Sequence, residues 1–146
     1  MPALDTRQFG TIDYSEETTL EFPSGMPAFE HHTRFLLIEK DSFAPFLFLQ
    51  SVADGQVSFL VLPVTRIDPA YRAVLEPEDM ELLGMNEESE LLVTLAVVTL
   101  TTGGAPTANL AAPILIHMQN RRGMQSVQPG SNYSHLTPLP AGGGRC

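Results

Sequence analysis

The sequence has no tryptophan and a single cysteine, and these absences exclude several classes of protein. The cysteine, Cys146, is the last residue, so the chain offers neither a disulfide framework nor a thiolate metal site. No apolar run approaches the roughly 18 residues that a membrane span needs, and no basic segment followed by an apolar stretch opens the chain. We therefore expect a soluble, cytoplasmic protein that does not act at a membrane.

Basic residues are also scarce: eight stand against seventeen acidic residues, for a formal net charge of −9. Such a chain repels phosphate backbones, so we expect no direct nucleic-acid binding. A basic protein partner would be attracted instead. An acidic surface also serves solubility alone, so charge by itself names no partner.

Motifs for catalysis are missing as well. There is no Gly-x-Ser-x-Gly, no His-Glu-x-x-His and no Gly-x-x-x-x-Gly-Lys. His31 and His32 are neighbours, and neighbouring side chains of an extended chain point to opposite sides, which disfavours a shared metal ion. Carboxylate pairs such as Glu16 and Glu17 lie in polar turns, where water solvates them. We expect no enzyme, no metal and no cofactor.

What the sequence does contain is a series of short β-branched and aromatic runs separated by Pro, Gly, Asp and Asn. This pattern predicts an all-β, mainly antiparallel protein. The length favours a single domain, which we place at residues 1–133, with a flexible tail at 134–146. The candidate strands are Arg7–Asp13, Thr18–Phe22, Arg34–Lys40, Phe46–Ser51, Val57–Val64, Leu91–Thr101 and Ile114–Met118.

One segment breaks the β pattern, the stretch EPEDMELLG at 76–84. It has proline where a first helical turn tolerates it, acidic residues near the positive end of the helix dipole, and Gly84 as a stop. We predict one short helix near 77–83. Its apolar residues Met80, Leu82 and Leu83 should pack on the sheet.

Two segments combine apolar residues with turn formers. In FPSGMPAFE, residues 22–30, the apolar side chains form either a corner of the core or a contact surface for a partner. In ANLAAPILIHM, residues 108–118, Pro113 marks the first residue of a strand or an exposed edge. Asn109 has a side chain that can bond nearby backbone where the chain turns.

Together the motifs FPSGMPAFE, FLFLQSVADGQVSFLVLPVTRIDPAY and NLAAPILIHMQNRRGMQ, in this order and spacing, resemble the bacterial flagellar assembly factor family, FliW. The resemblance runs from about Phe9 to Tyr133. It implies a compact, antiparallel β-barrel-like domain with two protein partners: newly made flagellin, and the carbon-storage regulator (CsrA), a small RNA-binding translational repressor. It further implies that the protein antagonises CsrA non-competitively and so couples flagellin translation to export.

The resemblance also suggests where partners bind. The candidate partner-binding residues match the family motifs and include residues that a β core does not require; they are Phe22, Met26, Pro27, Phe29, Gln50, Asn109 and Pro113. The alternative function is a β-barrel module that binds a small ligand or a carbohydrate. The lack of tryptophan and the presence of only three tyrosines disfavour a carbohydrate, because sugars stack on aromatic rings.

Overall fold

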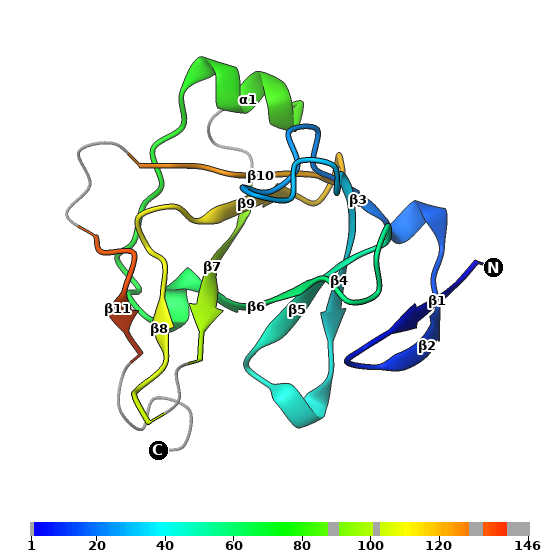
Figure 1. The fold of residues 1–146 in the computed structure, drawn as a ribbon. Helices are drawn as coiled ribbons and strands as arrows, with labels where there is room; N and C mark the ends of the chain where they lie inside the picture. The colour runs from blue at the N-terminus through cyan, green and yellow to red at the C-terminus, as the bar shows by residue number, and fades with distance from the viewer. Residues whose placement is uncertain (1, 88–90, 101–102, 129–132, 140–146) are drawn as a thin grey trace.

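The computed structural model describes residues 2–87, 91–100, 103–128 and 133–139. Figure 1 shows a body whose regular elements are mainly strands joined by loops, with helix α1 lying beside it. The strands are β1 (Ala3–Thr6), β2 (Gly10–Asp13), β3 (Leu20–Glu21), β4 (Arg34–Glu39), β5 (Leu47–Ser51), β6 (Ser58–Pro63), β7 (Val93–Thr99), β8 (Thr107–Ala108), β9 (Ile114–His117), β10 (Arg122–Gln125) and β11 (Thr137–Pro138). The helix is α1 (Pro77–Leu83), and the short 3-10 helices are η1 (Glu16–Thr18), η2 (Asp41–Phe43) and η3 (Val64–Arg66).

Seven of the strands close into a barrel in the order β7-β6-β5-β4-β3-β10-β9, because β9 pairs back onto β7. All of these pairings are antiparallel except that of β3 with β10, which is parallel. The barrel is weakest at β3: this strand pairs with β10 at one position, Glu21 with Arg122, and with β4 at two. The expected antiparallel, barrel-like fold is thus confirmed.

Strand β7 closes the barrel because it pairs with β6 on one side and with β9 on the other. Val93 to Leu95 pair with β9, whereas Val98 and Thr99 pair with β8, which in turn pairs with β11. Strands β8 and β11 therefore extend the sheet beyond the barrel. The hairpin of β1 and β2 forms a separate sheet.

The core follows the inward-facing side chains of the barrel strands. The first buried cluster includes Phe22, Phe35, Leu49, Leu95 and Ile116, each almost wholly inaccessible to solvent. A second cluster lies where β7 meets β8 and contains Tyr71 and Leu110. A third joins helix and barrel through Leu83, Met85 and Leu115.

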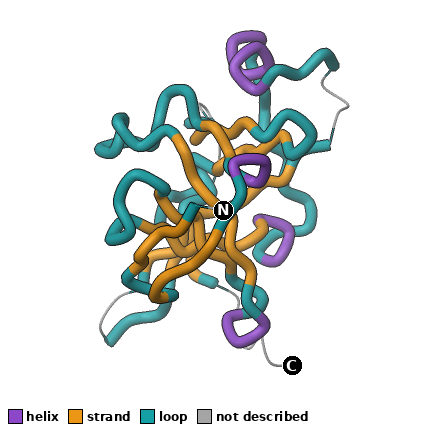
Figure 2. The backbone as a smooth tube through the Cα atoms, turned by 90° about the vertical axis from the view of Figure 1, so that its right-hand side faces the viewer, coloured by secondary structure: helices purple, strands orange, loops and turns teal. Residues whose placement is uncertain are grey.

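Helix α1 lies outside the barrel, at the end of the molecule that is uppermost in Figures 1 and 2. Its position agrees with the predicted helix near 77–83. Leu83 is fully buried against Leu115, and Met80 packs at the edge of the same cluster. Leu82 is an exception to the predicted packing, because it lines a surface cleft described below.

The predicted strands at 34–40, 46–51, 57–64, 91–101 and 114–118 are confirmed within two residues at their described ends. The predicted strand at 7–13 is confirmed only at Gly10–Asp13, because the chain makes a turn at 7–9. The predicted strand at 18–22 shrinks to Leu20–Glu21, since η1 occupies the residues before it. Strands β1, β8, β10 and β11 were not predicted.

The segment expected to be a flexible tail, 134–146, is described as far as residue 139. Thr137 and Pro138 form β11, which pairs with Ala108 and Thr107 of β8. Strand pairing therefore continues past residue 133, into the expected tail. Residues 140–146, with Cys146, lie outside the described part of the chain.

Candidate functional site

The motif FPSGMPAFE contains a tight turn. The Phe29 N–H donates to Met26 O at 2.7 Å, and the Met26 N–H donates to Phe29 O at 3.4 Å. Pro27 and Ala28 occupy the two central positions, and Ala28 has a φ of 70°. This arrangement, with proline first and a positive φ second, is that of a type II turn, whose tip is exposed to solvent.

The residues before the turn belong to the core. Phe22 is fully buried, and a Cβ added at Gly123 of β10 would lie 2.5 Å from its ring, so ring and strand are in close contact. Met26 is also buried. Phe22 and Met26 therefore offer no surface to a partner, which corrects their assignment as contact residues.

Gln50 is buried too, and its side chain organises the loop after β5. The Nε2 group donates to the carbonyl oxygens of Ser51 at 3.0 Å and Val57 at 3.1 Å, and to those of Asp54 and Gly55 at longer distances. Burial removes Gln50 from direct contact with a partner. It shapes the 51–57 loop instead.

Asn109 and Pro113 direct the chain into β9. The Asn109 Oδ1 accepts hydrogen bonds from the N–H groups of Ala111 at 3.1 Å and Ala112 at 3.0 Å. This is the local backbone bonding that the sequence suggested for Asn109. Pro113 is buried and immediately precedes β9, so it is neither the first residue of that strand nor an exposed edge. This burial corrects the assignment of Pro113 as a contact residue.

Of the seven candidates, Pro27 is exposed and Phe29 and Asn109 are partly exposed. Phe29 packs edge-on against His32 and Phe59, with ring centroids 5.6 Å away in both cases. The described contacts do not bring Asn109 to this corner, since its chain neighbours pack in the second cluster. We call Pro27, Phe29, His32 and Phe59 the aromatic corner.

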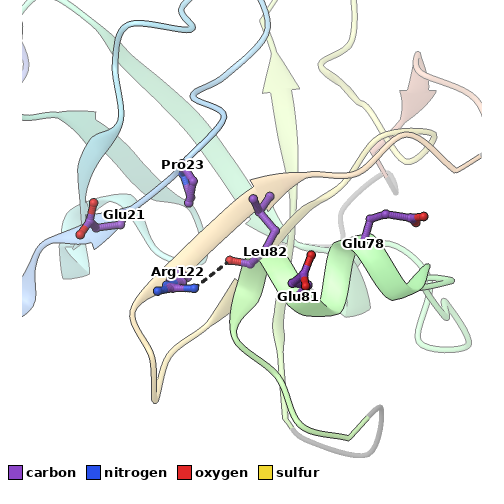
Figure 3. Close-up of a pocket in the computed structure, with 6 residues that line it drawn as sticks. All are labelled: Glu21, Pro23, Glu78, Glu81, Leu82 and Arg122. Carbon is purple, nitrogen blue, oxygen red and sulfur yellow. Dashed lines mark hydrogen bonds between the residues drawn. The ribbon is translucent and has the colours of Figure 1, made fainter.

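A second surface is a cleft between α1 and the strands β3 and β10, with a volume of about 530 Å³. Figure 3 shows its lining, which comes from three separate parts of the sequence: Glu21, Pro23, Glu78, Glu81, Leu82 and Arg122. We call it the acidic cleft. Its residues come from the motif FPSGMPAFE and the residue before it, from the predicted helix, and from the motif ending in NRRGMQ.

The turn between β9 and β10 holds α1 in place. The Asn120 Nδ2 donates to Gly84 O at 2.6 Å and to Leu83 O at 3.2 Å. Figure 3 shows Arg122 reaching from β10 toward the last turn of the helix, where its guanidinium donates to Leu82 O at 3.4 Å. These donors satisfy carbonyl groups that a helix leaves unpaired at its C-terminal end.

The charge of the acidic cleft follows from this arrangement. It contains three carboxylates, and its one guanidinium donates to a main-chain carbonyl of α1. The excess of negative charge makes the cleft suited to a lysine or arginine side chain of a partner. Sequence reasoning missed it, although Glu78 and Glu81 stand three residues apart and therefore share a face of the helix.

Within the described part of the chain, no three His, Cys, Asp or Glu side chains are grouped so that they could hold a metal ion. The described helices include none that is long and apolar enough to cross a membrane.

Three comparisons with known proteins agree. The family model described as FliW protein matches residues 3–139. The chain is 34% identical over 137 residues to the flagellar assembly factor FliW of Caldanaerobacter subterraneus subsp. tengcongensis, covering 93% of this chain and 91% of that one. It is 36% identical over 131 residues to that of Moorella thermoacetica, covering 88% and 82%. A crystal structure of the flagellar assembly factor FliW superimposes with a TM-score of 0.87 at 27% identity, covering 95% of this chain and 98% of the other.

Proposed function

Because this chain belongs to the FliW family of flagellar assembly factors, we propose that it acts by binding two proteins, newly made flagellin and the repressor CsrA. It sequesters CsrA when flagellin is scarce, which frees flagellin messenger for translation. Flagellin that accumulates captures the assembly factor and so releases CsrA. The protein is a regulatory binding protein without a catalytic role.

The acidic cleft supports the repressor half of this proposal. A protein that grips RNA presents basic residues, and the cleft offers three carboxylates on a rigid support of helix and strands. The net charge of −9 adds long-range attraction that weakens as salt rises. Of the surfaces described, the cleft is therefore the one whose chemistry best suits CsrA.

The antagonism is non-competitive. The assembly factor binds beside the RNA site of CsrA and lowers RNA affinity through altered charge and shape, without sharing the contacts that RNA makes. A titration in which excess RNA fully displaces the assembly factor from CsrA, as in simple competition, would contradict this mechanism.

The aromatic corner supports the flagellin half. The terminal segments of unassembled flagellin are largely disordered and bind as amphipathic helices, which calls for an apolar surface. Pro27 and Phe29 are the candidates of the sequence that remain accessible there. The alternative of a small-ligand or carbohydrate-binding barrel gains no support from the relatives reported above, which are flagellar assembly factors.

The test is calorimetric titration of purified CsrA and of flagellin into three variants. Glu78→Gln combined with Glu81→Gln removes two charges from the cleft while it leaves Asp79, whose carboxylate accepts the Glu76 N–H, in place. We expect this variant to bind CsrA at least tenfold more weakly, a loss of about 1.4 kcal/mol or more in binding free energy. Its binding of flagellin should be unchanged. Pro27→Glu places a charge on the aromatic corner and should weaken the binding of flagellin but not that of CsrA.

The matched control is Asp5→Asn combined with Asp13→Asn, which removes the same charge from the β1–β2 hairpin. If this control weakens the binding of CsrA as much as the cleft variant does, the overall charge of the protein and not the acidic cleft determines binding. If the unmodified chain binds neither protein, the proposed function itself is wrong.

A further inference from the structure

Part of strand β4 has no partner strand among the described residues on the side of β3, which leaves an open seam in the barrel beside this short strand. Strand β4 pairs with β5 along Phe35 to Glu39, but with β3 at only two positions, Phe35 with Leu20 and Arg34 with Glu21. Before β3 the chain turns into η1, where the Thr18 and Thr19 N–H groups donate to Ser15 O and Glu16 O. No strand of the described chain pairs with the rest of β4 on this side.

The direction of the free backbone groups follows from the alternation of an antiparallel ladder, in which successive residues bond to opposite neighbours. Arg34 O accepts from the Val52 N–H on the β5 side, and Thr33 O accepts from the Phe22 N–H on the β3 side. By this alternation, the N–H and C=O groups of Leu37 and Glu39 face the open seam. They form an edge to which an extended segment can add by backbone hydrogen bonds.

A hollow of about 390 Å³ lies along this edge. Its apolar floor consists of Leu20, Leu37, Leu47 and Met118, the last of them 47% exposed. The edge and the floor together match the two requirements of strand addition, a free ladder for affinity and a pocket for one side chain. We call this site the seam slot.

The charged residues at the rim of the seam slot determine which charge a bound segment should carry. Glu17 and Glu39 contribute carboxylates, and Arg121 contributes a guanidinium. The Arg121 guanidinium donates to the main-chain oxygens of Glu16 and Glu17, which anchors η1 to the turn between β9 and β10. The guanidinium keeps its positive charge, but the two carboxylates outnumber it, so the net charge of the rim is negative and favours basic side chains.

From these observations we infer that the seam slot binds an extended segment of a partner protein, in which an apolar residue lies between basic ones. The segment adds to the Leu37–Glu39 edge of β4 and inserts its apolar side chain between Leu20 and Met118. None of the residues that line the seam slot lines the acidic cleft, so the inference goes beyond the proposed function and stands or falls separately from it.

The test uses isotope-labelled full-length protein and a capped synthetic peptide with a central leucine, a threonine on each side of it and a lysine at each end. We expect the peptide to shift the amide resonances of Leu37 and Glu39 and to slow their hydrogen exchange. The same peptide with alternate backbone amides methylated cannot form the ladder and should bind at least tenfold more weakly.

Two variants locate the binding. Met118→Lys places a positive charge at the mouth of the slot and should weaken the basic peptide at least tenfold. Val127→Lys, at a residue that is 72% exposed and outside the slot, should bind the peptide as the unmodified protein does. Unperturbed Leu37 and Glu39 resonances, equal binding of the methylated peptide, or equal loss in both variants would each overturn the inference.

Discussion

Two residues of the motif FPSGMPAFE are constrained by backbone geometry rather than by side-chain chemistry. A Cβ at Gly25, where φ is 66°, would lie 2.6 Å from the backbone of Glu30, so no other residue fits without a shift of the chain. Ala28 has a similar φ of 70° but carries a side chain. Alanine is therefore not the most favourable residue for the backbone conformation at this position, which suits glycine better.

Replacing Ala28 by glycine should stabilise the protein. The left-handed conformation strains alanine but not glycine, and we expect the free energy of unfolding to rise by roughly 0.5–1 kcal/mol. Urea unfolding followed by circular dichroism measures the change. Ala53→Gly, at an exposed position with negative φ, is the control and should destabilise slightly. An equal response of both variants would show that strain at Ala28 has no effect.

At the scale of elements, α1 depends on the turn between β9 and β10. It spans only seven residues, and a helix this short is not stable alone in water. Burial of Leu83 and the hydrogen bonds from Asn120 to the last carbonyls compensate for that. Because Glu78 and Glu81 lie on this helix, its anchoring also positions the charges of the acidic cleft.

Asn120→Ala should loosen α1 without altering any charge. The loss of two hydrogen bonds costs about 1 kcal/mol, which corresponds to roughly fivefold faster hydrogen exchange in residues 77–84. Hydrogen-exchange mass spectrometry detects this change. Gln119→Ala, in the same turn, is the control and should exchange as the unmodified protein does. Unchanged exchange in Asn120→Ala would mean that packing of Leu83 alone holds the helix.

The elements that the sequence predicted are those with a pattern long enough to read. Strands β4 to β7 and β9 carry apolar runs, and α1 carries both start and stop signals. Strands β8 and β11 have two residues each, too few for an alternation, and their pairing is decided by distant partners. The acidic cleft was missed for a related reason, since only the folded chain brings Glu21 and Arg122 to the helix.

The buried candidates show why motif residues are poor guides to a surface. Phe22, Gln50 and Pro113 belong to the motifs that carry the family resemblance, yet their roles are in packing and loop geometry. Burial depends on which strand lies across from each residue, as Gly123 lies across from Phe22. A single sequence does not reveal this pairing.

At the scale of the whole molecule, two tyrosine side chains and one aspartate side chain join segments that are far apart in the sequence. Tyr133, near the end of the described chain, donates to the Asp68 Oδ2 at 2.7 Å, and its ring lies 4.5 Å from that of Tyr71. Tyr71 in turn donates to Leu110 O at 2.7 Å. The hydrogen bond from Tyr133 lowers the pKa of the Asp68 carboxyl, so this stabilisation is present above the ordinary pKa of aspartate and is lost on acidification.

At alkaline pH, the free energy of unfolding depends on Tyr71. Burial, with a smaller contribution from Tyr133, raises the pKa of Tyr71 to about 12. An unfolded tyrosine ionises near pH 10, so the folded protein retains a proton that the unfolded chain releases. The free energy of unfolding should therefore be unaffected by this group below about pH 10 and fall between about pH 10 and 12, by up to roughly 3 kcal/mol.

Urea unfolding at a series of alkaline pH values measures this decline. Tyr71→Phe is less stable at neutral pH, because it loses the hydrogen bond to Leu110, but it has no proton to release at this position and should lose less stability between pH 10 and 12. An equally steep decline in Tyr71→Phe would assign the alkaline limb to other groups. A shallower decline would show that ionisation of Tyr71 contributes to the loss of stability at alkaline pH.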